Sequence, residues 1–245
     1  MTAPYEALAQ VYDRWNARAD YQRWARFLDE CFTGSGSTTR VLDVCCGTGR
    51  MIGPLQRLGY QVAGVDGSAA MLAEAKANVA PGTRLRHARL PGAPPEDPVA
   101  DAAISCFDSV NYFVGDEDLL GLFRFVAASL RAGGLYVFDT NSPYKLREFY
   151  GNNNFGDDFG EFAYVWRNRL ADQRIRFLIT IFTAADSGYD RHEEVHEQRL
   201  YDVEEITAAA NTAGFAVVGL KDNYSTTEAH EKTLRQTWIL RREST

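Results

Sequence analysis

The stretch Arg40-Val-Leu-Asp-Val-Cys-Cys-Gly-Thr-Gly-Arg50 decides the fold. Its first half is an apolar run suited to a buried strand, and a helical pattern follows with Met51, Leu55 and Leu58. A strand therefore gives way to a helix at Gly47-Thr48-Gly49, where glycine lets the backbone approach a ligand closely. Because open parallel sheets bind ligands beyond the carboxyl ends of their strands, this turn is a candidate ligand site. Two glycines in an ordinary strand-to-helix turn would also explain the pattern.

Strand and helix signals alternate from residue 40 to about residue 140. Helical patterns begin near residues 50, 69 and 116. Such alternation predicts parallel strands with helices on both faces of the sheet. Proline content alone predicts a loop at residues 91–98. The predicted strands cover residues 40–45, 61–65, 84–88, 102–106 and 134–139.

Beyond residue 140 the pattern changes to long strands. Residues 161–170, 174–184 and 189–201 are separated by turn sequences at Ala171-Asp172 and Asp186-Ser-Gly188, which predicts an antiparallel meander. A helix at residues 203–213 and strands at 215–220 and 234–241 follow. We therefore expect an α/β protein, with a Rossmann-like, seven-stranded, mostly parallel sheet and an antiparallel insertion.

The first thirty residues predict one or two amphipathic helices that are rich in aromatic side chains. Spacings of three and four place most of the large side chains on one face. They either pack on the rest of the domain or lie across the ligand cleft and supply tyrosines to it. The residues concerned are Tyr5, Leu8, Val11, Tyr12, Trp15, Tyr21, Trp24, Phe27 and Leu28.

Composition excludes several classes of protein. The 245 residues are 45% hydrophobic and 24% charged, as in ordinary soluble globular proteins. A net charge of −7 with scattered Lys and Arg disfavours a nucleic-acid partner. The beginning of the sequence lacks a basic region followed by an apolar one, and no stretch reaches the length of a membrane span, so we expect a cytoplasmic protein with no membrane partner.

The four cysteines fit neither a metal-binding spacing nor a disulfide framework. Cys45 and Cys46 are adjacent, and Cys31 and Cys106 lie far from them. We expect all four to be reduced and no metal to be bound.

Two features narrow the ligand of the glycine turn. A dinucleotide-binding fingerprint needs a third glycine, but that position holds Ile52, and Gly53 comes one residue late. Asp66 ends the second predicted strand, where a carboxylate can accept both hydroxyls of an adenosine ribose. An Asp that only caps the next helix would also explain Asp66.

The sequence resembles the class I S-adenosylmethionine-dependent methyltransferases. Residues 41–49 resemble the first motif of that family and residues 62–71 the second. Residues 106–112, 130–135, 138–145 and 191–201 are similar to a bacterial branch that includes small-molecule N-methyltransferases of antibiotic and amino-sugar pathways. The resemblance covers nearly the whole chain. It implies an enzyme of one methyltransferase domain, with a helical lid at residues 1–35, a cofactor-binding half at 36–145, a substrate-side insertion at about 146–201 and the end of the core sheet at 202–245.

The resemblance also implies the cofactor contacts. The first motif would lie along the methionine part of S-adenosylmethionine, Asp66 would hold the ribose, and Gly67 and Met71 would flank the adenine. Many relatives hold the adenine amino group with an Asp, but Ala88 stands at that position, which leaves the backbone of Arg89 and Leu90 for this recognition. The residues assigned to the cofactor are Tyr12, Tyr21, Asp43, Cys45, Gly47, Asp66, Gly67, Met71, Arg89, Leu90, Cys106 and Phe107.

The methyl acceptor is less well defined. His192 and His196 lie four residues apart on one face of a predicted strand, and that face is either exposed to solvent or turned toward the site. We expect His196 or Tyr12 to be catalytic, as a base or as a group that positions the acceptor. Asp139 and Asn141 could hold a polar or cationic substrate, although Asp139 could instead cap a turn. Tyr5 and aromatic residues of the insertion are the further candidates, namely Phe155, Phe162, Tyr164 and Trp166.

Several functions agree with these residues. The leading one is methyl transfer from S-adenosylmethionine to a small molecule, at an amine nitrogen in specialised metabolism, which leaves S-adenosylhomocysteine as the product. The alternatives are O-methylation of a small molecule, RNA methylation, and a cofactor-binding protein without catalysis. An NAD dehydrogenase is disfavoured by Ile52. The sequence leaves the oligomeric state open, a homo-oligomer included.

Overall fold

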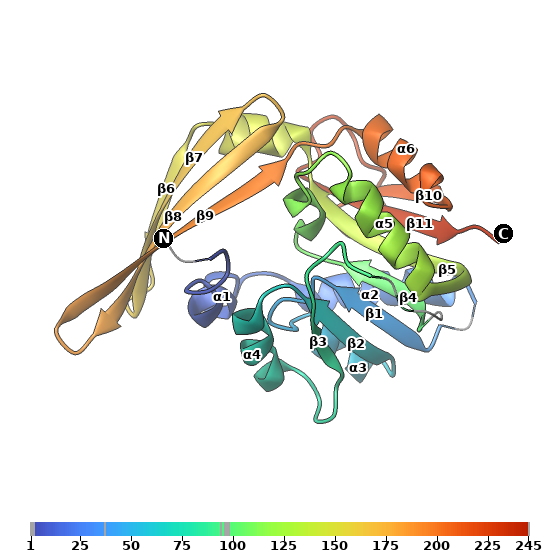
Figure 1. The fold of residues 1–245 in the computed structure, drawn as a ribbon, viewed down its shortest axis with the longest axis horizontal. Helices are drawn as coiled ribbons and strands as arrows, with labels where there is room; N and C mark the ends of the chain where they lie inside the picture. The colour runs from blue at the N-terminus through green and yellow to red at the C-terminus, as the bar shows by residue number, and fades with distance from the viewer. Residues whose placement is uncertain (1–2, 37, 94, 96–98, 245) are drawn as a thin grey trace.

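Two β-sheets organise the chain (Figure 1). The computed structural model describes residues 3–36, 38–93, 95 and 99–244. The larger sheet has seven strands in the order β10-β11-β5-β4-β1-β2-β3, and the smaller has four in the order β6-β7-β8-β9. The strands are β1 (Arg40–Val44), β2 (Gln61–Asp66), β3 (Leu85–His87), β4 (Ala100–Ser105), β5 (Leu130–Asn141), β6 (Asn154–Asp158), β7 (Phe162–Ala171), β8 (Arg174–Ala185), β9 (Gly188–Arg199), β10 (Phe215–Asp222) and β11 (Arg235–Arg242).

Two helices precede the first strand, and the other helices follow strands along the chain. The helices are α1 (Ala9–Trp15), α2 (Tyr21–Thr33), α3 (Ile52–Arg57), α4 (Ala69–Asn78), α5 (Asp118–Ser129) and α6 (Val203–Thr212), with short helical turns η1 (Ser109–Tyr112) and η2 (Lys145–Tyr150). The side chain of Asp20 caps α2 by accepting a hydrogen bond from the backbone N–H of Arg23. The N-terminal region thus forms two helices, as its aromatic spacing predicts.

The seven-stranded sheet confirms the predicted fold class. β1 to β5 pair in parallel, while β11 runs antiparallel to both β5 and β10. Strand order reverses at β1, because the chain proceeds to β2 and β3 on one side and returns to β4 on the other. A crevice outside the carboxyl ends of β1 and β4 is therefore the expected ligand site, and it lies directly at the glycine turn.

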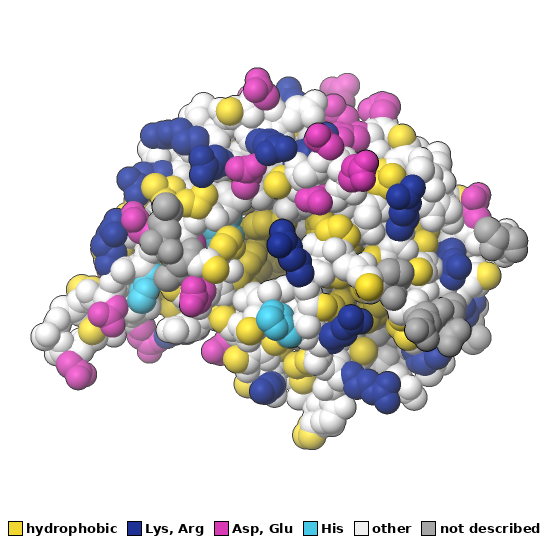
Figure 2. All heavy atoms as spheres, viewed as in Figure 1, with side chains coloured by type: hydrophobic (Ala, Val, Ile, Leu, Met, Phe, Trp, Pro, Cys, Tyr) yellow, Lys and Arg dark blue, Asp and Glu magenta, His cyan; other side chains and the backbone are white. Residues whose placement is uncertain are grey.

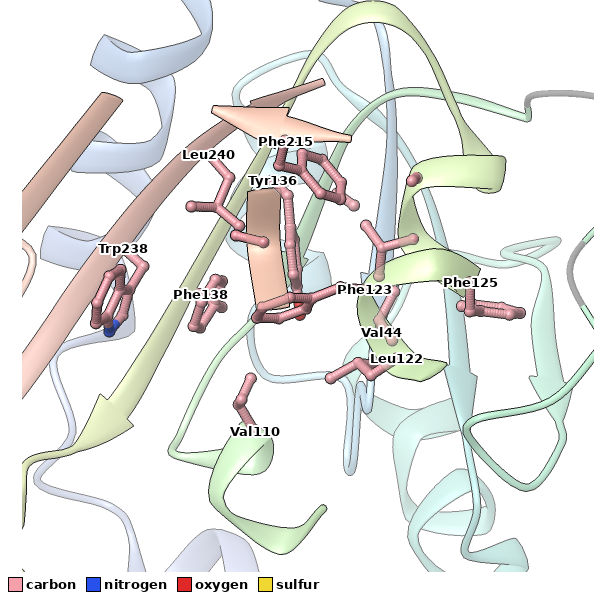
Figure 3. Close-up of a cluster of buried hydrophobic side chains, with 14 of the residues drawn as sticks. Val44, Val110, Leu122, Phe123, Phe125, Tyr136, Phe138, Phe215, Trp238 and Leu240 are labelled. Atoms are coloured by element: carbon pink, nitrogen blue, oxygen red, sulfur yellow. The ribbon is translucent and has the colours of Figure 1, made fainter. Parts of the chain in front are cut away.

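Both faces of this sheet are covered by apolar side chains. Along β5, Tyr136 and Phe138 face one layer, where Phe138 stacks on Trp238 with ring centroids 6.0 Å apart (Figure 3). The alternate positions Leu135 and Val137 pack in the opposite layer. Strands buried on both faces read as nearly continuous apolar runs, which is why the alternating strands and helices are evident in the sequence.

The four-stranded sheet is the predicted meander with one strand more. Its inner face carries Phe177 and Ile179 and packs on Leu8 and Val11 of the N-terminal region. Figure 1 shows this sheet standing to one side of the larger one, with α1 at their junction. The added strand, β6, was not predicted because its sequence, Asn-Phe-Gly-Asp-Asp, lacks the alternation of a half-buried strand and lies at the sheet edge.

Other differences from prediction are local. β5 begins at Leu130, directly after α5, instead of at residue 134. The π-helical turn η2 was not predicted. Part of the predicted loop at residues 91–98 (residues 94 and 96–98) lies outside the described residues. Within the described part of the chain, no helix has the length and apolarity needed to cross a bilayer.

Candidate active site

The glycine turn adopts a left-handed backbone at three positions. Cys45, Gly47 and Gly49 have φ angles of 64°, 52° and 73°. A Cβ on Gly49 would lie 2.9 Å from a side-chain atom of Val79, so this glycine permits close packing of α4. At Gly47 a Cβ would meet no atom within 4 Å. Gly47 lines a cavity, and its missing side chain therefore leaves room for a ligand.

Replacement of Gly47 by alanine tests this interpretation. A methyl group in left-handed backbone costs about 1–2 kcal/mol of stability, and in Gly47→Ala it would also face the cavity. We expect at least tenfold weaker binding of S-adenosylhomocysteine by calorimetry. The control is Gly59→Ala, because Gly59 also has a positive φ, 97°, and open surroundings, but it does not line the cavity. Equal loss of binding in both variants would contradict a ligand beside Gly47.

The side chain of Asp66 links the end of β2 to the glycine turn after β1. Its carboxylate accepts the backbone N–H of Gly47 at 2.8 Å and that of Ser68 at 2.8 Å. Ser68, not Asp66, caps α4, through a hydrogen bond from the N–H of Met71. Burial raises the pKa of Asp66, and the hydrogen bonds from Ser68 and Gly47 oppose that rise. The carboxylate is thus held rigidly with its free lone pairs available to the cavity.

A cavity of about 420 Å³ lies beyond the carboxyl ends of β1, β2 and β4. All twelve residues assigned to the cofactor from the sequence line it, and so does Tyr5. Figure 2 shows this face of the molecule hollowed, with hydrophobic side chains in its depth. Arg50 and Asp118 also line the cavity and were not predicted. Asp118 contributes a carboxylate to the cavity that Arg89 and Leu90 also line.

The N-terminal segment, residues 3–35, closes part of this cavity, and two carboxylates are among the groups that attach it to the rest of the chain. Asp13 of α1 accepts hydrogen bonds from Thr48 of the glycine turn, at 2.6 Å, and from Asn78, at 2.7 Å. The second attachment is Glu194 of β9, which accepts the backbone N–H groups of residues 5, 7 and 8 at 2.8, 2.6 and 2.9 Å. Because Tyr5, Tyr12 and Tyr21 line the cavity, these attachments set its shape.

A second, smaller cavity of about 140 Å³, here called the inner chamber, adjoins the first. Tyr5, Tyr12, Phe107 and Tyr112 line both spaces, so the two meet at these rings. The predicted substrate residues Asn141 and Trp166 line the chamber. Its other polar side chains, all missed from the sequence, are Asn16, Asp108, Lys145, Tyr150, Gln198 and Arg235.

Asp139 does not have the predicted role in substrate binding. It is fully buried and lines neither cavity. Its carboxylate accepts the backbone N–H groups of Phe107 and Asp108, at 2.7 and 2.8 Å, and is hydrogen-bonded by Tyr224 and Arg235. These bonds hold Phe107 and Asp108 in left-handed backbone, with φ angles of 66° and 50°. Asp139 therefore shapes the loop between the two cavities.

Of the two alternatives for the face that carries the histidines, the structure shows the buried one at His196. His196 is 1% exposed, and its Nε2 lies 2.9 Å from Glu194. Its Nδ1 is 3.3 Å from the hydroxyl of Tyr112, and its ring packs edge-on to Tyr5. His196 itself lines neither cavity, which contradicts direct contact with an acceptor. His192 is half-buried and also lines neither.

The phenols of Tyr5 and Tyr12 are available as hydrogen-bonding groups and not as bases. Burial raises the pKa of each well above its usual value, and neighbouring tyrosines add to the effect. Both therefore stay protonated at neutral pH. Tyr12 consequently suits the positioning role predicted for it.

The site defines a class of protein: a Rossmann-like enzyme whose nucleoside cavity opens to a small second chamber. Residues 41–134 match a family model described as a methyltransferase domain. The chain is 30% identical over 247 residues to the Geobacillus sp. (strain WCH70) protein called "Putative methyltransferase GWCH70_2453", covering 96% of this chain and 98% of that one. The chain belongs to the class I S-adenosylmethionine-dependent methyltransferases, and its cofactor is S-adenosylmethionine.

Solved structures agree with this assignment. A S-adenosylmethionine-dependent methyltransferase from Clostridium acetobutylicum ATCC 824 has a TM-score of 0.87 at 30% identity, covering 98% of this chain and 99% of that chain. The sugar N-methyltransferase KedS8 from Streptoalloteichus sp ATCC 53650 has a TM-score of 0.81 at 23% identity, covering 95% and 93%. The second similarity concerns the fold alone.

Proposed function

We propose that the protein methylates an amine nitrogen of a small molecule. The observation that carries this proposal is the inner chamber: a space of about 140 Å³ that meets the cofactor cavity at four aromatic rings. A chamber of this size suits a small acceptor better than a nucleic-acid strand. The net charge of −7 also disfavours RNA.

Cofactor contacts follow from the placement of the twelve residues. In this proposal Asp66 accepts the ribose hydroxyls, Gly47 lets the backbone approach the methionine part, and Gly67 and Met71 flank the adenine. Arg50, whose guanidinium lies over the ring of Tyr21 at 5.0 Å, would pair with the carboxylate of the methionine part. The backbone of Arg89 and Leu90, with the carboxylate of Asp118, would recognise the adenine edge in place of the Asp absent at residue 88.

Asp108 and the chamber's aromatic rings favour a cationic nitrogen. Asp108 follows Phe107, which lines both cavities, and its carboxylate accepts a hydrogen bond from Gln198 at 2.7 Å. Burial raises the pKa of Asp108, while Arg235 and Lys145 oppose the rise. An amine between Asp108 and the faces of Tyr5 and Tyr12 would gain ionic and cation–π stabilisation.

Methyl transfer then depends on positioning. S-adenosylmethionine supplies a methyl group on a sulfonium, and the nitrogen lone pair forms the new N–C bond while the C–S electron pair stays on sulfur. The rings of Tyr5, Tyr12 and Phe107 would align the nitrogen with that methyl group and exclude water. An ammonium must first lose a proton. Asp108, which lines the chamber beside Phe107, would be the carboxylate that accepts it.

The named relative adds support of a weaker kind. KedS8, which shares the fold, is a sugar N-methyltransferase. We therefore propose, more specifically, that the methylated amine belongs to specialised metabolism.

O-methylation is the second candidate, and one observation favours it. Tyr112 lines both cavities, and its hydroxyl contacts His196, which contacts Glu194. This chain of groups could take up the proton that a hydroxyl acceptor must lose.

A screen of acceptors distinguishes these functions. The purified protein with S-adenosylmethionine is offered small primary amines, matched alcohols and phenols, and undermethylated RNA, and S-adenosylhomocysteine release is measured. We expect turnover with amines. Turnover only with hydroxyl compounds or RNA would overturn the proposal, and cofactor binding without turnover of any acceptor would favour a non-catalytic protein.

A further inference from the structure

The inner chamber has two chemically different ends. At one end are the four aromatic residues shared with the cofactor cavity. At the other end, toward the surface, Lys145 and Arg235 line both the chamber and a surface cleft of about 380 Å³ formed with residues 222–223 and 232–234. Arg235 also extends to the aromatic end, where its guanidinium lies 5.1 Å from the centroid of the Phe107 ring. An acceptor with its nitrogen at the aromatic end therefore has its far end toward Lys145.

The two cations at this end differ in their partners. Arg235 forms ion pairs with Asp139 and, at 3.3 Å, with Asp108, so its charge is balanced. Lys145 donates to the amide oxygen of Asn141 at 2.7 Å. Among the described residues, no carboxylate lies within ion-pair distance of Lys145. Burial, together with the charge of Arg235, lowers its pKa to about 8, although the more distant charges of Asp108 and Asp139 act in the opposite direction.

A buried donor without a partner lies near Lys145. The indole N–H of Trp166 is buried and has no hydrogen-bond partner in the described part of the chain. Trp166 and Lys145 both contact Tyr150: the Trp166 ring is 5.3 Å from the Tyr150 ring, and the Lys145 ammonium is 5.2 Å from that ring's centroid. A buried donor without a hydrogen-bond partner is unfavourable. An acceptor group on the ligand would satisfy it.

We propose that the methyl acceptor carries a carboxylate at the end remote from its nitrogen, and that Lys145, with the indole N–H of Trp166, binds this carboxylate. The inference rests on the proposed amine methylation and deepens it. It makes the substrate class a small amino acid, with its ammonium at Asp108 and its carboxylate at Lys145. The ammonium of such an acceptor would then meet the Asp108 carboxylate, and its carboxylate would meet the Lys145 ammonium.

Matched acceptor pairs test the proposal. The probes are two pairs of amines. Pentylamine has a methyl group where 5-aminopentanoate has its carboxylate, and benzylamine has a hydrogen atom where 4-(aminomethyl)benzoate has its carboxylate. Binding to the protein loaded with S-adenosylhomocysteine is measured by ligand-observed NMR, and KM and kcat are measured by S-adenosylhomocysteine release. We expect the carboxylate member of at least one pair to bind about tenfold to a hundredfold more tightly, as for a charge-assisted hydrogen bond. A further probe, 4-aminobutyl phosphate, is compared with 5-aminopentanoate. Tighter binding of the phosphate would overturn the assignment of a carboxylate.

Variants locate the effect. Lys145→Met should remove the preference for the carboxylate member of each pair, because it should raise the KM of that member more than the KM of the amine without a carboxylate. Lys145→Arg should restore part of the preference, and Trp166→Phe should reduce it by a smaller factor. The control Lys76→Met removes the same charge from an exposed position on α4 and should have no effect.

The outcomes are distinguishable. If both members of every pair bind equally, or if Lys145→Met weakens them equally, the inference is overturned while amine methylation stands. If no amine of either kind binds or is turned over, the proposed function itself fails.

Discussion

Asp66→Ala should weaken S-adenosylhomocysteine binding by about 10²–10³-fold. The carboxylate would accept two ribose hydroxyls, and a hydrogen bond to a charged group contributes about 1.5–3 kcal/mol. It also accepts the N–H groups of Gly47 and Ser68, so its loss frees the glycine turn as well. Isothermal titration calorimetry at neutral pH measures the change directly.

The control for this variant is Glu74→Ala, which removes a carboxylate from an exposed position on the following helix, α4. It should leave affinity within about twofold, because surface substitutions change free energies by about 0.5 kcal/mol or less. Circular dichroism shows whether Asp66→Ala is folded. A folded Asp66→Ala protein that binds as tightly as the parent would refute the assignment of the ribose site.

The same carboxylate predicts a pH dependence. Burial raises the pKa of Asp66 despite the opposing backbone hydrogen bonds, and the ribose hydroxyls favour its charged form. Affinity should therefore be complete above the raised pKa and should fall as the pH drops through it. The fall should begin at a higher pH than the ordinary Asp value of about 3.9. Titrations from pH 7.5 to 5, repeated on Asp66→Ala, should show the dependence only in the parent protein.

The cofactor half of the molecule could be predicted from the sequence because its contacts are local. Each parallel strand of the core is an apolar run, and the ligand-facing residues follow directly at its carboxyl end. The residue pattern therefore indicates Gly47 and Asp66 as candidate ligand residues, and both line the cavity. It does not reveal β6, since a polar edge strand carries no periodic signal.

The inner chamber could not be predicted because its residues meet only in the folded chain. Asp108 and Arg235 are separated by 127 positions yet form an ion pair. For the same reason Asp139 was misassigned: the groups that saturate its carboxylate come from β11, from Tyr224 between β10 and β11, and from the loop after β4. A carboxylate at a strand end looks the same in the sequence whether it faces a ligand or a buried arginine.

Glu194→Ala should release the N-terminal segment from both cavities. Glu194 is fully buried, and its carboxylate accepts three backbone N–H groups, from Tyr5, Ala7 and Leu8, as well as contacting His196. Breaking one partner of a buried charged network destabilises by about 3–5 kcal/mol. Because Tyr5 and Tyr12 line both cavities, we expect cofactor affinity to fall by about a hundredfold or more and turnover to be lost.

Hydrogen exchange identifies the cause of that loss. In Glu194→Ala the amides of residues 5, 7 and 8 should lose protection, while those of β1 and β4 keep it. The control is Glu197→Ala on the same strand, whose carboxylate pairs with Arg174 and Arg176 at the surface and should contribute about 1 kcal/mol or less. Retained protection at residues 5–8 in Glu194→Ala would contradict the attachment.

In the parent protein, protonation of Glu194 at acidic pH should also release the N-terminal segment. Burial alone would raise the pKa of Glu194, but the hydrogen bonds from His196, Leu8 and Tyr5 outweigh burial and lower it. A carboxylate with a lowered folded-state pKa stabilises fully above its unfolded value, about 4.3 for Glu, and that stabilisation is lost as the pH falls through the folded-state pKa. Exchange at residues 5–8 should therefore accelerate only below about pH 4.3, beyond the intrinsic pH dependence of amide exchange. In Glu194→Ala the segment should be open throughout this range, because the group whose protonation releases it is absent.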